Sequence, residues 1–161
     1  MIGIIDYGLG NSRAFLNIYR RLDIPCLISA DAEQLKRCDH LILPGVGAFD
    51  WAMSKLNDSG LSSTLNEMAL DGEIPILGVC IGLQMLGEGS DEGTKPGLGW
   101  IKGHSKRLSA ETQIRLPHMG WNEAEPNEPL GLFNNLVNAR FYFLHSYCFQ
   151  PTAESDGLAW A

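Results

Sequence analysis

Short apolar runs alternate with helix-like patterns along the first half of the chain. The apolar runs are nearly continuous, which is typical of strands that are buried on both faces. They lie at residues 2–6, 26–29, 40–43 and 75–79.

Between these runs, apolar residues recur at the spacing of an α-helix. The first helix is predicted to start after Asn11, which can cap it, and to extend to Leu22 with Arg20 and Arg21 in its last turn. Asp31 and Gln34 have the spacing of a capping box at the start of a second, short helix. Further helices are predicted around residues 49–56, 61–69 and 81–87.

Alternating strands and helices predict an α/β fold, in which parallel strands are joined by right-handed crossovers into a doubly wound sheet. In such sheets the chemistry lies at the carboxyl ends of the strands. Three glycine-rich segments fall at these ends, at residues 6–11, 44–49 and 78–82.

The second half has a different pattern. Residues 87–99 are rich in glycine and acidic residues and are predicted to form a loop. Further strands, including an antiparallel segment, are predicted at 100–108, 113–117 and 140–147. We find no internal repeat and no linker, so residues 1–161 are expected to belong to a single domain.

Composition narrows the function. With 12 basic and 19 acidic residues the net charge is −7, which argues against a nucleic-acid partner. The four cysteines form no CxxC pair, so neither a disulfide framework nor a metal site is expected, and no cofactor is predicted. Because no segment has the pattern of a signal peptide or a membrane span, we expect a cytoplasmic protein without membrane contact.

The strongest chemical signal is Gly78-Val79-Cys80-Ile81-Gly82, a nucleophile elbow with cysteine in the place of serine. Such a turn exposes its nucleophile, and the flanking glycines avoid clashes. The alternative interpretation is a buried cysteine between two packing glycines.

A nucleophile that attacks a carbonyl needs an oxyanion hole. The amide of Ile81 and the amides of Gly45, Val46 and Gly47 are the candidate donors, although residues 44–47 could also be a plain turn. Gly8-x-Gly10 is no dinucleotide-binding motif, because Arg13 replaces its third glycine.

Together these segments resemble the class I (triad-type) glutamine amidotransferases, and more narrowly the glutaminase subunits of imidazole glycerol phosphate synthase in histidine biosynthesis. The resemblance extends in order along essentially the whole chain. The segments that carry it are Ile5–Asn11, Pro44–Phe49, Gly78–Leu86, Pro117–Asn122 and Tyr142–Tyr147.

The resemblance implies that Cys80 attacks the side-chain amide of glutamine, forms a thioester and releases ammonia. It implies that Gly45–Gly47 is the oxyanion strand. It further places a group of residues around the substrate, of which Glu92 could instead be a solvated acid. These residues are Gln84, Glu92, His145, Ser146 and Tyr147.

The resemblance also implies a heterodimer with a synthase (cyclase) subunit, a (β/α)8 barrel that receives the ammonia. Ammonia would otherwise be lost to water, which gives a physical reason for such a partner. For Trp121 the alternative is a core aromatic. The residues expected at this interface are Asn11, Pro117, His118, Met119, Trp121 and Asn122.

One feature of the family does not occur in these 161 residues. The family's catalytic base is a histidine in a His-Pro-Glu segment near the C-terminus, and none of the four histidines stands in one. We therefore expect the domain to be incomplete at its C-terminus and the chain alone to lack appreciable glutaminase activity. A naturally shortened partner-binding protein, or His145 acting as base, are the alternatives.

Other functions stay open at this point. A paralogous subunit could feed ammonia to another acceptor, such as a surface sugar. A non-catalytic interaction subunit would have an unreactive Cys80. A different cysteine hydrolase on a flavodoxin-like sheet is disfavoured by residues 117–122, which such an enzyme would not need.

Overall fold

A computed structural model gives the structure of the chain. The residues described are 1–72, 74–108, 115–127, 131–134, 136, 139–157 and 159–160.

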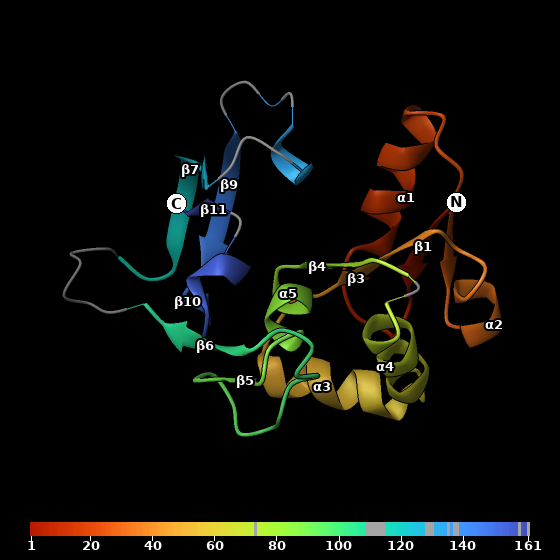
Figure 1. The fold of residues 1–161 in the computed structure, drawn as a ribbon, viewed down its shortest axis with the longest axis horizontal. Helices are drawn as coiled ribbons and strands as arrows, with labels where there is room; N and C mark the ends of the chain where they lie inside the picture. Colours follow the sequence, from red (N-terminus) through yellow and green to blue (C-terminus); the bar gives the residue numbers. More distant parts are fainter. Residues whose placement is uncertain are drawn as a thin grey trace.

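The centre of the fold is a four-stranded parallel sheet with the order β2-β1-β3-β4 (Figure 1). The predicted strands are confirmed, except that β1 ends one residue earlier, at Ile5, β4 begins one residue later, at Ile76, and β3 extends one residue further, through Pro44. Because β2 and β3 lie on opposite sides of β1, the direction of winding reverses at β1, as in a doubly wound sheet. The strands are β1 (Ile2–Ile5), β2 (Cys26–Ser29), β3 (His40–Pro44) and β4 (Ile76–Val79).

Helices cover both faces of this sheet. In Figure 1, α1 lies on one side of the strands and α3 and α4 lie on the other. The predicted helices are confirmed, except that the first one ends one residue earlier, at Arg21, and the last one ends at Met85 rather than at residue 87. The helices are α1 (Ser12–Arg21), α2 (Ala32–Leu35), α3 (Phe49–Asp58), α4 (Ser62–Leu70) and α5 (Ile81–Met85).

The main core lies on the face covered by α3 and α4. Phe49, Leu56 and Leu65 from these helices are fully buried against Ile5 and Leu43 of the sheet. The face under α1 is less covered, since no residue of α1 is buried. The core therefore fixes β3 and α3, which frame the segment at residues 44–49.

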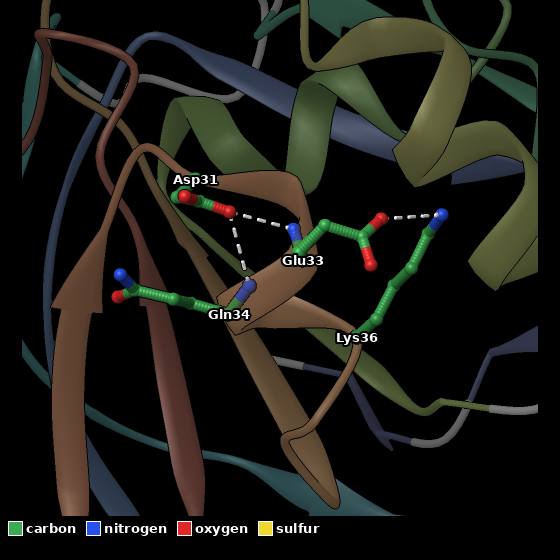
Figure 2. Close-up of polar contacts among 4 residues, drawn as sticks. All are labelled: Asp31, Glu33, Gln34 and Lys36. Carbon is green, nitrogen blue, oxygen red and sulfur yellow. Dashed lines mark hydrogen bonds and ion pairs between the residues drawn. The ribbon is translucent and has the colours of Figure 1, made fainter.

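Helix caps explain where the first two helices begin. The Asn11 side chain accepts a hydrogen bond from the Ala14 amide at 3.2 Å, and Asp31 accepts from the amides of Glu33 and Gln34 at 2.8 and 3.2 Å (Figure 2). The other hydrogen bond of the predicted capping box, from the Asp31 amide to the Gln34 side chain, does not form. The Gln34 side chain instead accepts from the Ser29 hydroxyl at 3.1 Å, and that hydroxyl accepts from the Asp31 amide.

The second half forms small sheets beside the parallel one. β10 (Tyr147–Pro151) pairs antiparallel with β6 (Gly103–Arg107), which also pairs with β5 (Gly89–Ser90). β7 (His118–Glu123) and β9 (Arg140–His145) form an antiparallel ribbon, to the left in Figure 1. The remaining elements are β8 (Glu125–Pro126), β11 (Ala159–Trp160) and the 3-10 helices Gly131–Phe133 and Glu154–Asp156.

The antiparallel segment is confirmed, but three element predictions are wrong. The expected loop at 87–99 contains β5, because Gly89 and Ser90 pair with β6. Of the strand expected at 113–117, residues 113–114 lie outside the described residues, and the strand starts only at His118. The strand expected at 140–147 is divided at Ser146, because its two halves pair with different partners.

None of the helices in the described part of the chain is both long enough and apolar enough to cross a membrane.

Candidate active site

Cys80 lies at the sharp turn between β4 and α5. Its backbone has φ 58° and ψ −120°, and the residue is exposed. A Cβ on Gly78 would lie 2.6 Å from the Leu83 Cα, and a Cβ on Gly82 would overlap the Leu43 carbonyl oxygen. The predicted nucleophile elbow is thus present in its geometry, and the alternative of a buried cysteine is wrong.

The segment at 45–47 lies directly against this turn. A Cβ on Gly45 would be 2.5 Å from the Gly82 nitrogen and 3.0 Å from the Ile81 carbonyl carbon. Gly47 has φ 90°, a conformation that residues with a Cβ rarely adopt, and Val46 is exposed. The structure therefore brings Gly45 and Ile81, two of the expected oxyanion donors, to the same place.

Tyr7 supports this segment and was not singled out from the sequence. Its hydroxyl, which is buried, donates a 2.7 Å hydrogen bond to the carbonyl of Pro44, the residue before Gly45. Burial, and secondarily the nearby charge of Cys80, raise the pKa of Tyr7 to about 12. Tyr7 is therefore a neutral hydrogen-bond donor at physiological pH, and only its position in the Ile5–Asn11 segment hinted at a role.

Gln84 lies one helical turn after Cys80. It is buried, and its side-chain oxygen has no hydrogen-bond partner among the described residues. A buried acceptor without a partner costs about 1–3 kcal/mol, so a site of this kind suits a ligand that donates a hydrogen bond.

Glu92 is held at the start of α3. Its Oε2 accepts a 2.9 Å hydrogen bond from the amide of Phe49, two residues after Gly47. The alternative of a freely solvated acid is therefore wrong. Nearby, Asp50 accepts hydrogen bonds from the amides of Thr94 and Lys95, a second contact that no local pattern in the sequence indicates.

His145 is paired with His118 and not with Cys80. Its Nδ1 lies 3.0 Å from the Tyr147 carbonyl oxygen and its Nε2 lies 3.3 Å from the His118 Nδ1. A carbonyl only accepts, so Nδ1 carries a hydrogen and donates it to the Tyr147 carbonyl. Because both ring nitrogens are engaged, the alternative of His145 as the base for Cys80 is not supported.

Ser146 and Tyr147 connect the two antiparallel sheets. The Ser146 carbonyl accepts from the Leu108 amide at 2.9 Å, and Tyr147 begins β10 opposite Arg107. Both residues are half-buried. Phe149, two residues further along β10, lies close to Gly87 just after α5, so β10 runs beside the helix that follows Cys80.

The ribbon of β7 and β9 exposes large apolar side chains on one face. Met119 lies opposite Leu144 and Trp121 opposite Tyr142 in the ladder, so the four share a face. Trp121 is 60% exposed and packs edge-on against Tyr142. The alternative of a core aromatic at position 121 is therefore wrong, and a contiguous apolar patch of this kind is typical of an interaction surface.

The other residues expected at the interface are more dispersed. Asn122 and His118 lie on the opposite face of the ribbon, Pro117 directly precedes it, and Asn11 is exposed at the start of α1.

Comparison with known proteins decides the family. The model of the family "Glutamine amidotransferase class-I" matches residues 4–161. The imidazole glycerol phosphate synthase subunit HisH of Bdellovibrio bacteriovorus is 48% identical over 163 residues, which cover 99% of this chain and 80% of that protein. The chain belongs to the class I glutamine amidotransferases, among the HisH subunits of imidazole glycerol phosphate synthase.

Further relatives agree with this assignment. The HisH subunit of Leptospira interrogans is 43% identical over 165 residues, which cover 100% of this chain and 81% of that protein. A crystal structure of a glutamine amidotransferase superposes with a TM-score of 0.76 over 98% of this chain and 78% of the other, at 19% identity. At that identity the structure speaks for the fold alone, and it confirms the α/β fold with a mostly parallel sheet.

The predicted class of activity is confirmed as well. A chain of this family is a glutamine amidotransferase, with the glutaminase role that HisH subunits have in histidine biosynthesis. A paralogous acceptor and a non-catalytic protein, the alternatives from the sequence, are not favoured.

Proposed function

We propose that Cys80 is the nucleophile that hydrolyses glutamine. Its sulfur attacks the carboxamide carbon, and the resulting oxyanion accepts hydrogen bonds from the amides of Ile81 and of Gly45–Gly47. The C–N bond then breaks, ammonia leaves, and water hydrolyses the thioester to glutamate. The observation that carries this proposal is the exposed Cys80 at a φ of 58°, with Gly45 packed against the peptide between Ile81 and Gly82.

The proton transfers in these steps need a general base. In the family this is the histidine of a His-Pro-Glu segment, which does not occur in residues 1–161. We accordingly assign the base to no residue described here, and we expect the 161-residue chain alone to be without appreciable glutaminase activity.

We further propose that glutamine is held beside α5. The Gln84 side-chain oxygen, which has no hydrogen-bond partner among the described residues, would accept a hydrogen bond from the substrate. The Glu92 carboxylate would bind the substrate ammonium, and His145, Ser146 and Tyr147 would border the site from β9 and β10. This assignment is supported by the position of Gln84 one turn after Cys80 and by the proximity of Glu92 to the segment at 45–47.

The partner we propose is the synthase (cyclase) subunit, a (β/α)8 barrel that takes up the ammonia. The apolar face of the ribbon, formed by Met119, Trp121, Tyr142 and Leu144, would contact it. We propose Asn11 and Pro117 as further contacts of this partner, and His118 and Asn122 as contacts made from the opposite face of the ribbon. We place the complex in the cytoplasm, where the four cysteines, all free in the structure, would stay reduced.

Labelling with an electrophilic glutamine analogue tests the nucleophile. We expect 6-diazo-5-oxo-norleucine to modify Cys80 in the natural full-length chain, and glutamine to protect against it. Cys26, Cys38 and Cys148 are internal controls, because they are buried or half-buried. Peptide mapping that finds no label on Cys80, or equal label on all four, would overturn the proposal.

An activity assay tests the partner. Glutamine hydrolysis by the natural full-length chain should rise when the cyclase is added and should fall about 10³-fold or more in Cys80→Ala. Equal activity with and without the cyclase would count against ammonia transfer.

A further inference from the structure

Two carboxylates connect helix α3 with the loop at residues 91–95, each accepting hydrogen bonds from the other segment. From the loop, the Glu92 carboxylate accepts a hydrogen bond from the Phe49 amide at 2.9 Å. From the helix, the Asp50 carboxylate accepts hydrogen bonds from the amides of Thr94 and Lys95 at 3.0 and 2.9 Å, and from the Thr94 hydroxyl at 3.3 Å. Each segment thus binds backbone N–H groups of the other, and we call this pair of contacts the carboxylate clamp.

The start of α3 explains why the clamp is needed. Ala48 stands at the N-cap and has no side chain that could accept a hydrogen bond from the first turn. A helix leaves its first N–H groups without partners, and Glu92 satisfies the first of them from a distant part of the chain. The amides of Thr94 and Lys95 in turn lower the pKa of Asp50, so Asp50 stays a carboxylate at neutral pH.

Gly93 makes room for this arrangement. The three atoms nearest to a Cβ built on Gly93 are the carboxyl atoms of Asp50, and Oδ1 would overlap it. A side chain at position 93 would therefore displace the Asp50 carboxylate from its place beside the Thr94 and Lys95 amides.

The clamp joins two parts of the proposed glutamine site. α3 begins at Phe49, two residues after Gly47 at the end of the oxyanion segment, and the loop carries Glu92. We propose that Asp50 is a positioning residue for glutamine binding: it fixes the loop so that Glu92 Oε2 stays on Phe49 and Oε1 faces the substrate ammonium. This inference rests on the proposed function.

Kinetics of Asp50 variants test the inference. In the natural full-length chain bound to the cyclase, Asp50→Ala should raise the KM for glutamine about 10-fold with kcat within about twofold, because the loss is in binding. In Asp50→Asn the side-chain oxygen still accepts a hydrogen bond, so the rise in KM should be smaller than in Asp50→Ala. The matched control is Asp58→Ala, at the exposed far end of the same helix, which should leave both constants unchanged.

A double-mutant cycle separates the clamp from general damage. Gly93→Ala should raise KM by displacing the Asp50 carboxylate, and in the Asp50→Ala background it should add little. Additive effects of the two substitutions would overturn the inference.

Hydrogen exchange gives a readout that does not depend on activity. Asp50→Ala should abolish protection of the Thr94 and Lys95 amides, and Asp58→Ala should preserve it. Unchanged protection would show that there is no clamp, and lost protection with an unchanged KM would show that the clamp does not position the substrate. If the wild-type complex hydrolyses no glutamine, the proposed function fails, and the inference fails with it.

Discussion

At Cys80 the backbone adopts φ 58° and ψ −120°, a conformation that glycine adopts at lower cost than residues with a Cβ. Strain of this kind is worth about 1–3 kcal/mol and is typical of functional sites. The position of the thiol at the exposed tip of the turn is therefore maintained against a local cost.

We predict that Cys80→Gly is more stable than Cys80→Ala by about 1 kcal/mol, although both lack the thiol. Equilibrium denaturation in urea measures the difference. Ser54→Gly and Ser54→Ala, inside α3, are the control variants. At that position the alanine variant should be the more stable by about 1 kcal/mol. Equal stability of the two Cys80 variants would mean that the turn is unstrained.

Tyr7 gives a prediction for the alkaline range. Its pKa rises from 10.0 to about 12 on folding, so its contribution to stability is complete below pH 10 and is lost as the pH rises toward 12. Between these values the unfolded chain loses the Tyr7 proton while the folded chain keeps it.

We therefore expect the stability of the wild type relative to Tyr7→Phe to fall by about 1.4 kcal/mol for each pH unit from 10 to 12. At pH 7, Tyr7→Phe should cost about 1 kcal/mol through the lost hydrogen bond to Pro44. Urea denaturation at pH 7, 9, 10 and 11 follows both effects, and a stability difference that is constant with pH would contradict the assignment.

At the scale of elements, the contact between β3 and α5 determines the site. Gly45 and Gly82 bring the two backbones so close that a Cβ on Gly82 would overlap the carbonyl of Leu43. The oxyanion segment and the turn at Cys80 therefore stay together only while both positions lack a side chain.

We expect Gly82→Ala to destabilise the protein by about 3 kcal/mol or more, because backbone and not a flexible side chain must shift. Gly60→Ala is the control. A Cβ on Gly60 has open space, and its φ of 76° should cost only about 1 kcal/mol. Thermal or urea denaturation compares the two, and similar losses would argue against a tight contact at Gly82.

The elements of the parallel sheet could be predicted almost completely. Their strands are continuous apolar runs, and their helices have local caps such as Asn11 and Asp31. The antiparallel part could be predicted less well. Whether Ser146 continues a strand or ends it depends on which strand each neighbour pairs with, and pairing is a property of the tertiary structure.

At the scale of the whole molecule, the ribbon of β7 and β9 places its apolar face away from the core. The patch of Met119, Trp121, Tyr142 and Leu144 on this two-stranded ribbon includes the aromatic pair Trp121 and Tyr142. Such groups supply much of the binding energy at protein interfaces.

We predict that Trp121→Ala weakens binding to the cyclase by about 2 kcal/mol, a factor of about 30 in Kd, with little change in Tm. Trp51→Ala is the matched control, since Trp51 is 54% exposed on α3 and lies outside the ribbon. Isothermal titration calorimetry measures both affinities, and equal affinity of the two variants would exclude the ribbon as the docking face.

The sequence by itself determined the α/β fold, the elbow at Cys80 and the family, because these depend on local periodicity and on short contiguous motifs. Only the tertiary structure decided the contacts between distant segments. Tyr7 meets Pro44, Glu92 meets Phe49, Asp50 meets Thr94, and His145 meets His118 instead of Cys80. The two residues in each of these four contacts are 27 to 44 positions apart in the sequence. The path of the chain through the sheet, and not a local pattern, therefore decides which groups meet.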